Sequence, residues 1–127
     1  MVKFEVKNMR AVGMHHHGPT SLFIGGLYFL LWEPENPEDF GNATAIHDKQ
    51  GKCRAYLTRK DAAIISTLFY GNSIEGVVKC MPIVSPHVEK QKLGPQQECV
   101  LTFEVCDRET DFVSYVLTSR GCSFVKY

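Results

Sequence analysis

The sequence predicts a small α+β barrel of about six short strands and two helices. Three observations lead to this prediction: apolar runs of strand length recur along the chain, most of them lie near one another in sequence, and no segment is repeated. The 127 residues suit one domain, residues 1–127, around one hydrophobic core. Acidic and basic residues number 14 each, so the whole-chain charge gives no indication of a polyanionic partner.

The first half of the chain carries four predicted strands. An alternating segment at residues 4–12 indicates the opening strand, and the apolar run at residues 27–32 is typical of a fully buried strand. Small and apolar residues alternate at residues 42–48, which indicates another strand. Gly51 then separates them from the run at residues 53–57, which fits an antiparallel hairpin with a short loop.

The clearest predicted helix follows Thr58, which can cap the first backbone amides. Apolar residues then recur at spacings of three and four, and Gly71 is placed to end the helix. Residues 109–121 are expected to form a second helix, although their β-branched residues also suit a strand. Strands are expected at residues 74–81 and 100–105, joined by a long polar loop, and at residues 123–127.

The five cysteines are odd in number, widely spaced and never arranged as C-x-x-C. They are therefore expected to be reduced and partly buried, not a disulfide framework or a zinc site. No apolar run is long enough to span a bilayer, and the opening residues lack the apolar segment of a signal peptide. An intracellular protein with no membrane partner is expected.

The most specific pattern lies at residues 32–46, which read WEPENPEDFGNATAI. It is followed by Gly51, by the pair Tyr56-Leu57 and by a helix from Arg59. This order resembles the HIRAN domain, whose pattern is R-E-P-x-N-P-x-D-x-N-A-I, a glycine turn, and G-Y/H-I/L before a helix. The resemblance covers most of the chain.

HIRAN domains resemble OB-type β-barrels with two helices, and they occur alone or in SWI/SNF-type DNA repair enzymes. The resemblance implies a module that binds the 3′-hydroxyl end of single-stranded DNA and acts in DNA repair or stalled replication fork processing, in the nucleus. It also implies a helicase or ATPase as a partner or adjoining domain, and a monomer is expected. The chain lacks G-x-x-x-x-G-K-[ST], so it is not expected to be the motor itself.

Asp39 is the sharpest candidate that the resemblance implies. A carboxylate beside a phosphate chain is repulsive, so it suits a DNA site only where it accepts a hydrogen bond. A 3′-terminal hydroxyl supplies such a donor, whereas a 3′-phosphate adds repulsion and is expected to be rejected. The alternative is that Asp39 only bonds the backbone of its own turn.

Arg59 and Lys60 open the predicted helix, where backbone amides and the positive end of the helix dipole favour a phosphate. Arg59 matches a basic position of the family, while Lys60 equally suits solvated surface. Tyr56 stands where the family has a ring near the terminal nucleotide. It can stack on a base, or it can be a barrel tyrosine with a bonded hydroxyl. Arg59 and Lys60 thus begin a basic strip. The preceding hairpin is expected to extend it with Lys49, Lys52 and Arg54, whereas Asp48 and Asp61 are expected to dilute it.

His15 and His16 correspond to a basic and an aromatic residue of DNA-binding family members. His16 is expected to stack on or hydrogen-bond a nucleotide, and either histidine gains positive charge below neutral pH. Exposed histidines without a role are the alternative. A metal shared by His15 and His17 is not favoured, because no third ligand is evident. The chain also departs from the family pattern at Trp32, in place of arginine, and at Glu38, in place of an aromatic residue.

A catalytic function is not expected. No nucleophile motif is present, and the acidic pairs have no defined partner, so no catalytic residue and no cofactor is assigned. The alternative function is a protein-interaction module on the same fold. In that case the acidic loop from Glu33 to Asp39 binds a basic partner, and nucleic acid is not involved.

Overall fold

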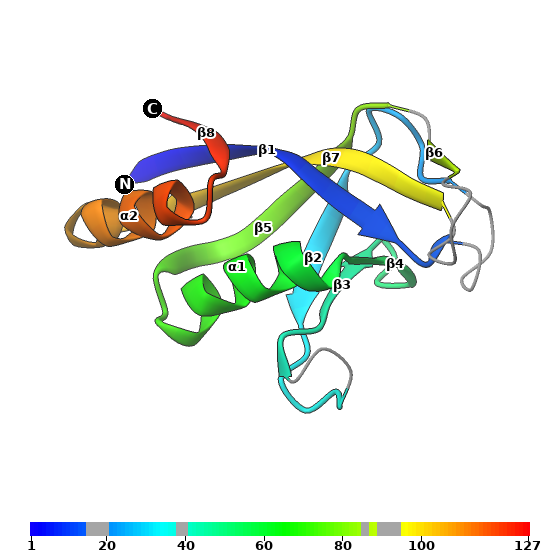
Figure 1. The fold of residues 1–127 in the computed structure, drawn as a ribbon, viewed down its shortest axis with the longest axis horizontal. Helices are drawn as coiled ribbons and strands as arrows, with labels where there is room; N and C mark the ends of the chain where they lie inside the picture. Colours follow the sequence, from blue (N-terminus) through cyan, green and yellow to red (C-terminus); the bar gives the residue numbers. More distant parts are fainter. Residues whose placement is uncertain (15–20, 38–40, 85–86, 89–94) are drawn as a thin grey trace.

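The computed structural model describes residues 1–14, 21–37, 41–84, 87–88 and 95–127. Its elements follow one another along the chain as strands, two α-helices and a short 3-10 helix (Figure 1). They are β1 (Val2–Val12), β2 (Tyr28–Trp32), β3 (Thr44–His47), β4 (Cys53–Leu57), α1 (Arg59–Tyr70), β5 (Ile74–Pro82), β6 (His87–Val88), β7 (Pro95–Val105), η3 (Asp107–Glu109), α2 (Thr110–Ser119) and β8 (Ser123–Lys126).

Six of the strands close into an antiparallel barrel. They pair in the order β7-β5-β2-β3-β4-β1, and β1 pairs with β7 as well, which closes the ring. The short strands β6 and β8 extend the sheet beside β7 and β1. The predicted small α+β barrel with two helices is therefore confirmed.

Strand β1 is long enough to pair with two different strands along the same edge. Its first half pairs with β8, and its last residues pair with β4. Between these two parts the register against β7 shifts at Val6 and Met9, where Asn8 has a positive φ of 62°. Asparagine tolerates this left-handed conformation better than most residues, and the bulge bends β1 around the barrel.

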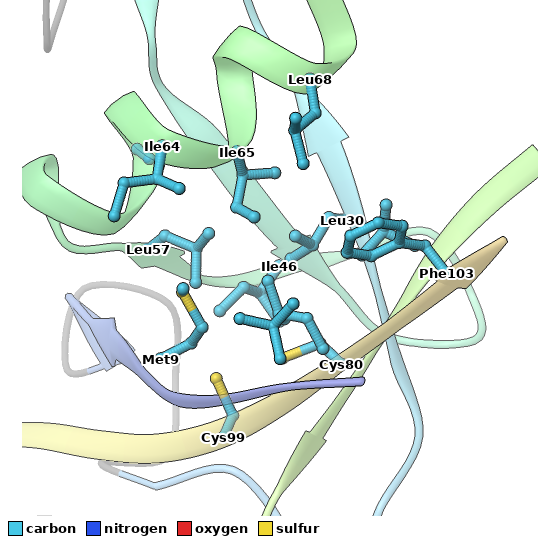
Figure 2. Packing of buried hydrophobic residues seen from close by; sticks show 14 of the residues in the cluster. Met9, Leu30, Ile46, Leu57, Ile64, Ile65, Leu68, Cys80, Cys99 and Phe103 are labelled. Carbon is cyan, nitrogen blue, oxygen red and sulfur yellow. The ribbon is translucent and has the colours of Figure 1, made fainter. Parts of the chain in front are cut away.

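Helix α1 covers the barrel and completes the core. Ile64, Ile65 and Leu68 point from α1 toward strand residues that include Leu57 and Ile46 (Figure 2). The predicted cap is confirmed, because Thr58 Oγ1 accepts a hydrogen bond from the Asp61 amide at 3.3 Å.

The prediction that Gly71 ends α1 is confirmed, and the left-handed residue is the next one along the chain. Gly71 follows the last helical residue, but its φ is −80°, and it is Asn72 that turns left-handed with a φ of 54°. The Asn72 amide donates to the Phe69 carbonyl and the Ser73 amide donates to the Leu68 carbonyl. These bonds satisfy carbonyls that would otherwise end the helix without partners.

Two expectations need correction. Strand β2 is not buried on both faces: Tyr28 and Leu30 point into the core, whereas Leu31 is 51% exposed on the outside of the barrel. The polar loop is shorter than predicted, because β7 begins at Pro95 and includes Gln97. The five cysteines are free thiols, as expected. No helix in the described part of the chain is both long and apolar enough to cross a membrane.

Candidate functional site

The motif loop, defined as residues 33–43, connects β2 to β3. It begins with a turn that backbone hydrogen bonds stabilise. The Glu33 amide donates to the Ala43 carbonyl at 2.8 Å, which continues the ladder between β2 and β3 by one step. The Asn36 amide donates to the Glu33 carbonyl at 3.0 Å, and Pro34 is the second residue of this turn. Because the proline ring fixes φ near the value that this position requires, the sequence favours the turn.

The Glu33 carboxylate ties the turn to β4. Its Oε1 atom accepts hydrogen bonds from the Tyr56 hydroxyl at 2.8 Å and from Asn36 Nδ2 at 3.0 Å. Burial, and then the hydrogen bond to Glu33, raise the pKa of Tyr56 well above its usual range. The phenol therefore stays protonated and keeps donating to the carboxylate at any physiological pH.

The far end of the motif loop is anchored on α1. The buried Ser66 hydroxyl donates to Asn42 Oδ1 at 2.7 Å. Trp32 Nε1 donates to the Gly41 carbonyl at 3.0 Å, and the indole stacks on Phe69 with ring centroids 6.0 Å apart. Trp32, which departs from the family pattern, thus packs the loop against the helix.

Three predicted site residues lie close in sequence at the connection from β4 to α1: Tyr56, Arg59 and Lys60. Arg59 and Lys60 are exposed and form the first two positions of α1. Tyr56 is half-buried and its hydroxyl is bonded, as in the alternative of a barrel tyrosine. Whether these residues bind DNA stays a prediction. His15, His16 and Asp39 lie outside the described residues.

The acidic residues near this basic strip weaken it less than the sequence suggested. Asp61 is 8% exposed, and its Oδ2 accepts from the Arg10 amide at 2.8 Å. Burial raises the pKa of Asp61. Asp48 does offset one cation, because its Oδ2 accepts from Arg54 Nε at 2.9 Å. The hydrogen bond from the Lys52 backbone amide, and then that from the Arg54 side chain, lower the pKa of Asp48.

Sequence reasoning assigned no structural role to Glu33, Ser66 or Gln97. Gln97 is fully buried; its Oε1 accepts from the Leu22 amide at 2.8 Å and its Nε2 donates to the Leu22 carbonyl at 3.0 Å. Its place in β7 could have been found from the period-two alternation with Cys99 that continues along the strand. Among the described residues, no group of three His, Cys, Asp or Glu side chains is placed to hold a metal.

The HIRAN domain of human HLTF has a similar structure. It is 15% identical in sequence, and the superposition covers 94% of this chain and 93% of that chain with a TM-score of 0.72. This chain has the HIRAN fold. A protein from Lactobacillus plantarum is also similar, at 17% identity over 80% of this chain and 99% of that chain, with a TM-score of 0.55. No protein-family model and no curated protein matches the sequence. The HIRAN fold predicted from the motif is thus confirmed by structural similarity.

Proposed function

We propose that this chain is a binding module for the 3′-hydroxyl end of single-stranded DNA, acting in DNA repair or stalled fork processing in the nucleus. The observation that carries the proposal is the hydrogen-bonded group of Glu33, Asn36 and Tyr56. It fixes the turn at residues 33–36 on β4, the strand that leads into the exposed pair Arg59 and Lys60. The HIRAN fold supports it as well.

The group of Glu33, Asn36 and Tyr56 favours binding because it is formed before any ligand arrives. A turn that is already formed loses less conformational entropy when a ligand binds. Asp39 follows Asn36 by three positions in the sequence, and its proposed role is to accept from the terminal hydroxyl. The proposed role of Arg59 is to attract the neighbouring phosphate at the positive end of α1.

The proposed activity is binding and not catalysis. Any chemical or motor step belongs in this proposal to a helicase or ATPase, present as a partner or as an adjoining domain, while this chain acts as a monomer that captures the strand end. Affinity is expected to fall as salt rises, because phosphate neutralisation releases counterions.

Fluorescence anisotropy with a 5′-labelled single strand tests this proposal. Asp39→Ala is expected to weaken binding to a free 3′-hydroxyl end at least ~10-fold, because the terminal hydroxyl then loses its charged hydrogen-bond acceptor. Lys3→Ala, which removes an exposed charge on β1, is expected to have little effect. Equal effects of the two substitutions contradict the assignment.

Arg59→Ala has a matched control in Arg108→Ala, since both arginines are exposed and each lies near the start of a helix. Arg59→Ala is expected to reduce the slope of log affinity against log salt by about one phosphate contact. Arg108→Ala is expected to leave that slope unchanged. If no strand binds, while a basic protein partner binds and loses affinity on Glu35→Ala, at an exposed carboxylate of the acidic loop from Glu33 to Asp39, the protein-interaction alternative is favoured.

A further inference from the structure

A second concave site lies at the end of β2 that is remote from the motif loop. It is a cavity of about 360 Å³ between the start of β2 and the turn that joins β3 to β4. This volume is within the range typical of small-ligand sites. Its apolar wall and its polar rim are formed mainly by Leu22, Phe23, Leu27, Tyr28, Lys49 and Arg54.

The apolar wall is fixed without a ligand. Both backbone polar groups of Leu22 are bonded by the buried Gln97 side chain, at 2.8 and 3.0 Å. The Phe23 amide donates to the hydroxyl of Tyr28 at 3.0 Å, and Tyr28 itself is buried. The Phe23 side chain nevertheless remains 81% exposed. The fold therefore holds an aromatic ring in water at the mouth of a preformed cavity.

The polar rim has a positive net charge. Its cations are Lys49, which is exposed, and Arg54. Its one carboxylate, Asp48, is already engaged: Oδ2 accepts from Arg54, while Oδ1 accepts from the amides of Gln50 and Lys52 at 2.9 and 3.0 Å. A ligand with an apolar planar body and an anionic group complements these walls.

We propose that this pocket binds one nucleotide, with its base against Phe23 and Leu27 and its phosphate beside Lys49. Base stacking on an aromatic ring and phosphate attraction to lysine are the two contacts by which single strands are commonly held. A free mononucleotide and a nucleotide within a strand share this chemistry.

The position of the pocket favours the nucleotide within a strand. Arg54 lines the pocket and precedes Tyr56 by two positions on β4, which is a distance of roughly 6–7 Å along the strand. This step rests on the proposed function: a strand whose 3′ end lies near Tyr56 reaches the pocket with a nucleotide farther toward its 5′ end. The pocket then extends recognition beyond the terminus.

Two pairs of variants test the pocket. Phe23→Ala removes the exposed ring, and Ile24→Ala is its control, because Ile24 is the next residue, is 59% exposed and does not line the cavity. Lys49→Gln removes the rim charge, and Lys7→Gln removes an exposed charge on β1, outside the cavity lining and away from the basic strip. Anisotropy is measured with a dinucleotide and with a strand of about six nucleotides, both with a 3′-hydroxyl, and thymidine monophosphate binding is measured by calorimetry.

We expect the longer strand to bind more tightly than the dinucleotide. We expect Phe23→Ala and Lys49→Gln each to lower the affinity for the longer strand about 10-fold. These two variants are expected to keep the wild-type affinity for the dinucleotide, and both control variants are expected to keep the wild-type affinity for every ligand. Calorimetric binding of the mononucleotide that disappears in the same two variants, without an effect of strand length, assigns the pocket to free nucleotides.

If all four variants bind every ligand with the same affinity, the proposal that the pocket binds a nucleotide is overturned. In that case end binding that still depends on Asp39 leaves the proposed function standing. Conversely, mononucleotide binding that depends on Phe23, in a protein that binds no strand, retains the pocket and rejects the proposed function.

Discussion

The bond between Glu33 and Tyr56 gives a quantitative prediction, because it joins two elements through one short contact. The Tyr56 hydroxyl lies 2.8 Å from Glu33 Oε1, and both side chains are half-buried. Hydrogen bonds to charged groups contribute about 1.5–3 kcal/mol to stability. Partial exposure to water weakens the bond, so we expect a coupling free energy near the lower limit, about 1.5 kcal/mol.

A double-mutant cycle isolates this coupling. The free energy of unfolding is measured by urea denaturation for the wild-type chain, Tyr56→Phe, Glu33→Ala and the double variant. The bond of Asn36 to Glu33 is lost equally in both variants that lack the carboxylate, so it cancels in the cycle. Tyr115→Phe, at a 70% exposed position on α2, is the control and is expected to change stability by less than about 0.5 kcal/mol. A coupling below about 0.5 kcal/mol refutes the inference that this bond holds the motif loop.

Three further predictions concern the fold that supports the site. Gln97→Leu leaves both backbone groups of Leu22 buried without partners, and urea denaturation should show a loss of about 2–4 kcal/mol; a loss below about 1 kcal/mol counts against it. Burial raises the pKa of Asp61 above its ordinary 3.8, so the folded state holds this proton more tightly. The folded state therefore loses stability as the pH rises from the unfolded-state pKa through the higher pKa of the folded state, where Asp61 ionises. Wild type should gain stability relative to Asp61→Asn as the pH falls from about 7 to about 4, and a pH-independent difference contradicts this. Leu68→Ala, at a fully buried position, should cost about 2–5 kcal/mol by urea denaturation; a loss below about 1 kcal/mol means that α1 does not complete the core.

The fold was largely predictable, because local signals agreed with the global structure. Thr58 and the apolar spacing after it marked α1, and Gly51 marked the turn between β3 and β4. The errors arose where tertiary context overrides local pattern. Gln97 is polar, yet it lies in the core because its amide replaces a strand partner for Leu22. Leu31 is apolar, yet it faces outward because a single-layer barrel leaves the outer face of β2 uncovered.

The position of the motif was predictable, and the contacts that shape it were not. Glu33 and Tyr56 are 23 residues apart and meet only because Ala45 pairs with Tyr56 across β3 and β4. Ser66 reaches Asn42 only because α1 crosses beside the loop. Such contacts depend on strand register and helix packing, which one sequence pattern does not specify.

We propose that this chain captures a free 3′-hydroxyl end, and the chemistry of that end tests the proposal most directly. One oligonucleotide is prepared with a 3′-hydroxyl and with a 3′-phosphate, and wild-type affinity for each is measured by anisotropy at the same salt concentration. We expect the hydroxyl form to bind at least ~10-fold more tightly, because a phosphate repels the acceptor carboxylate. Equal affinity for the two ends contradicts the claim.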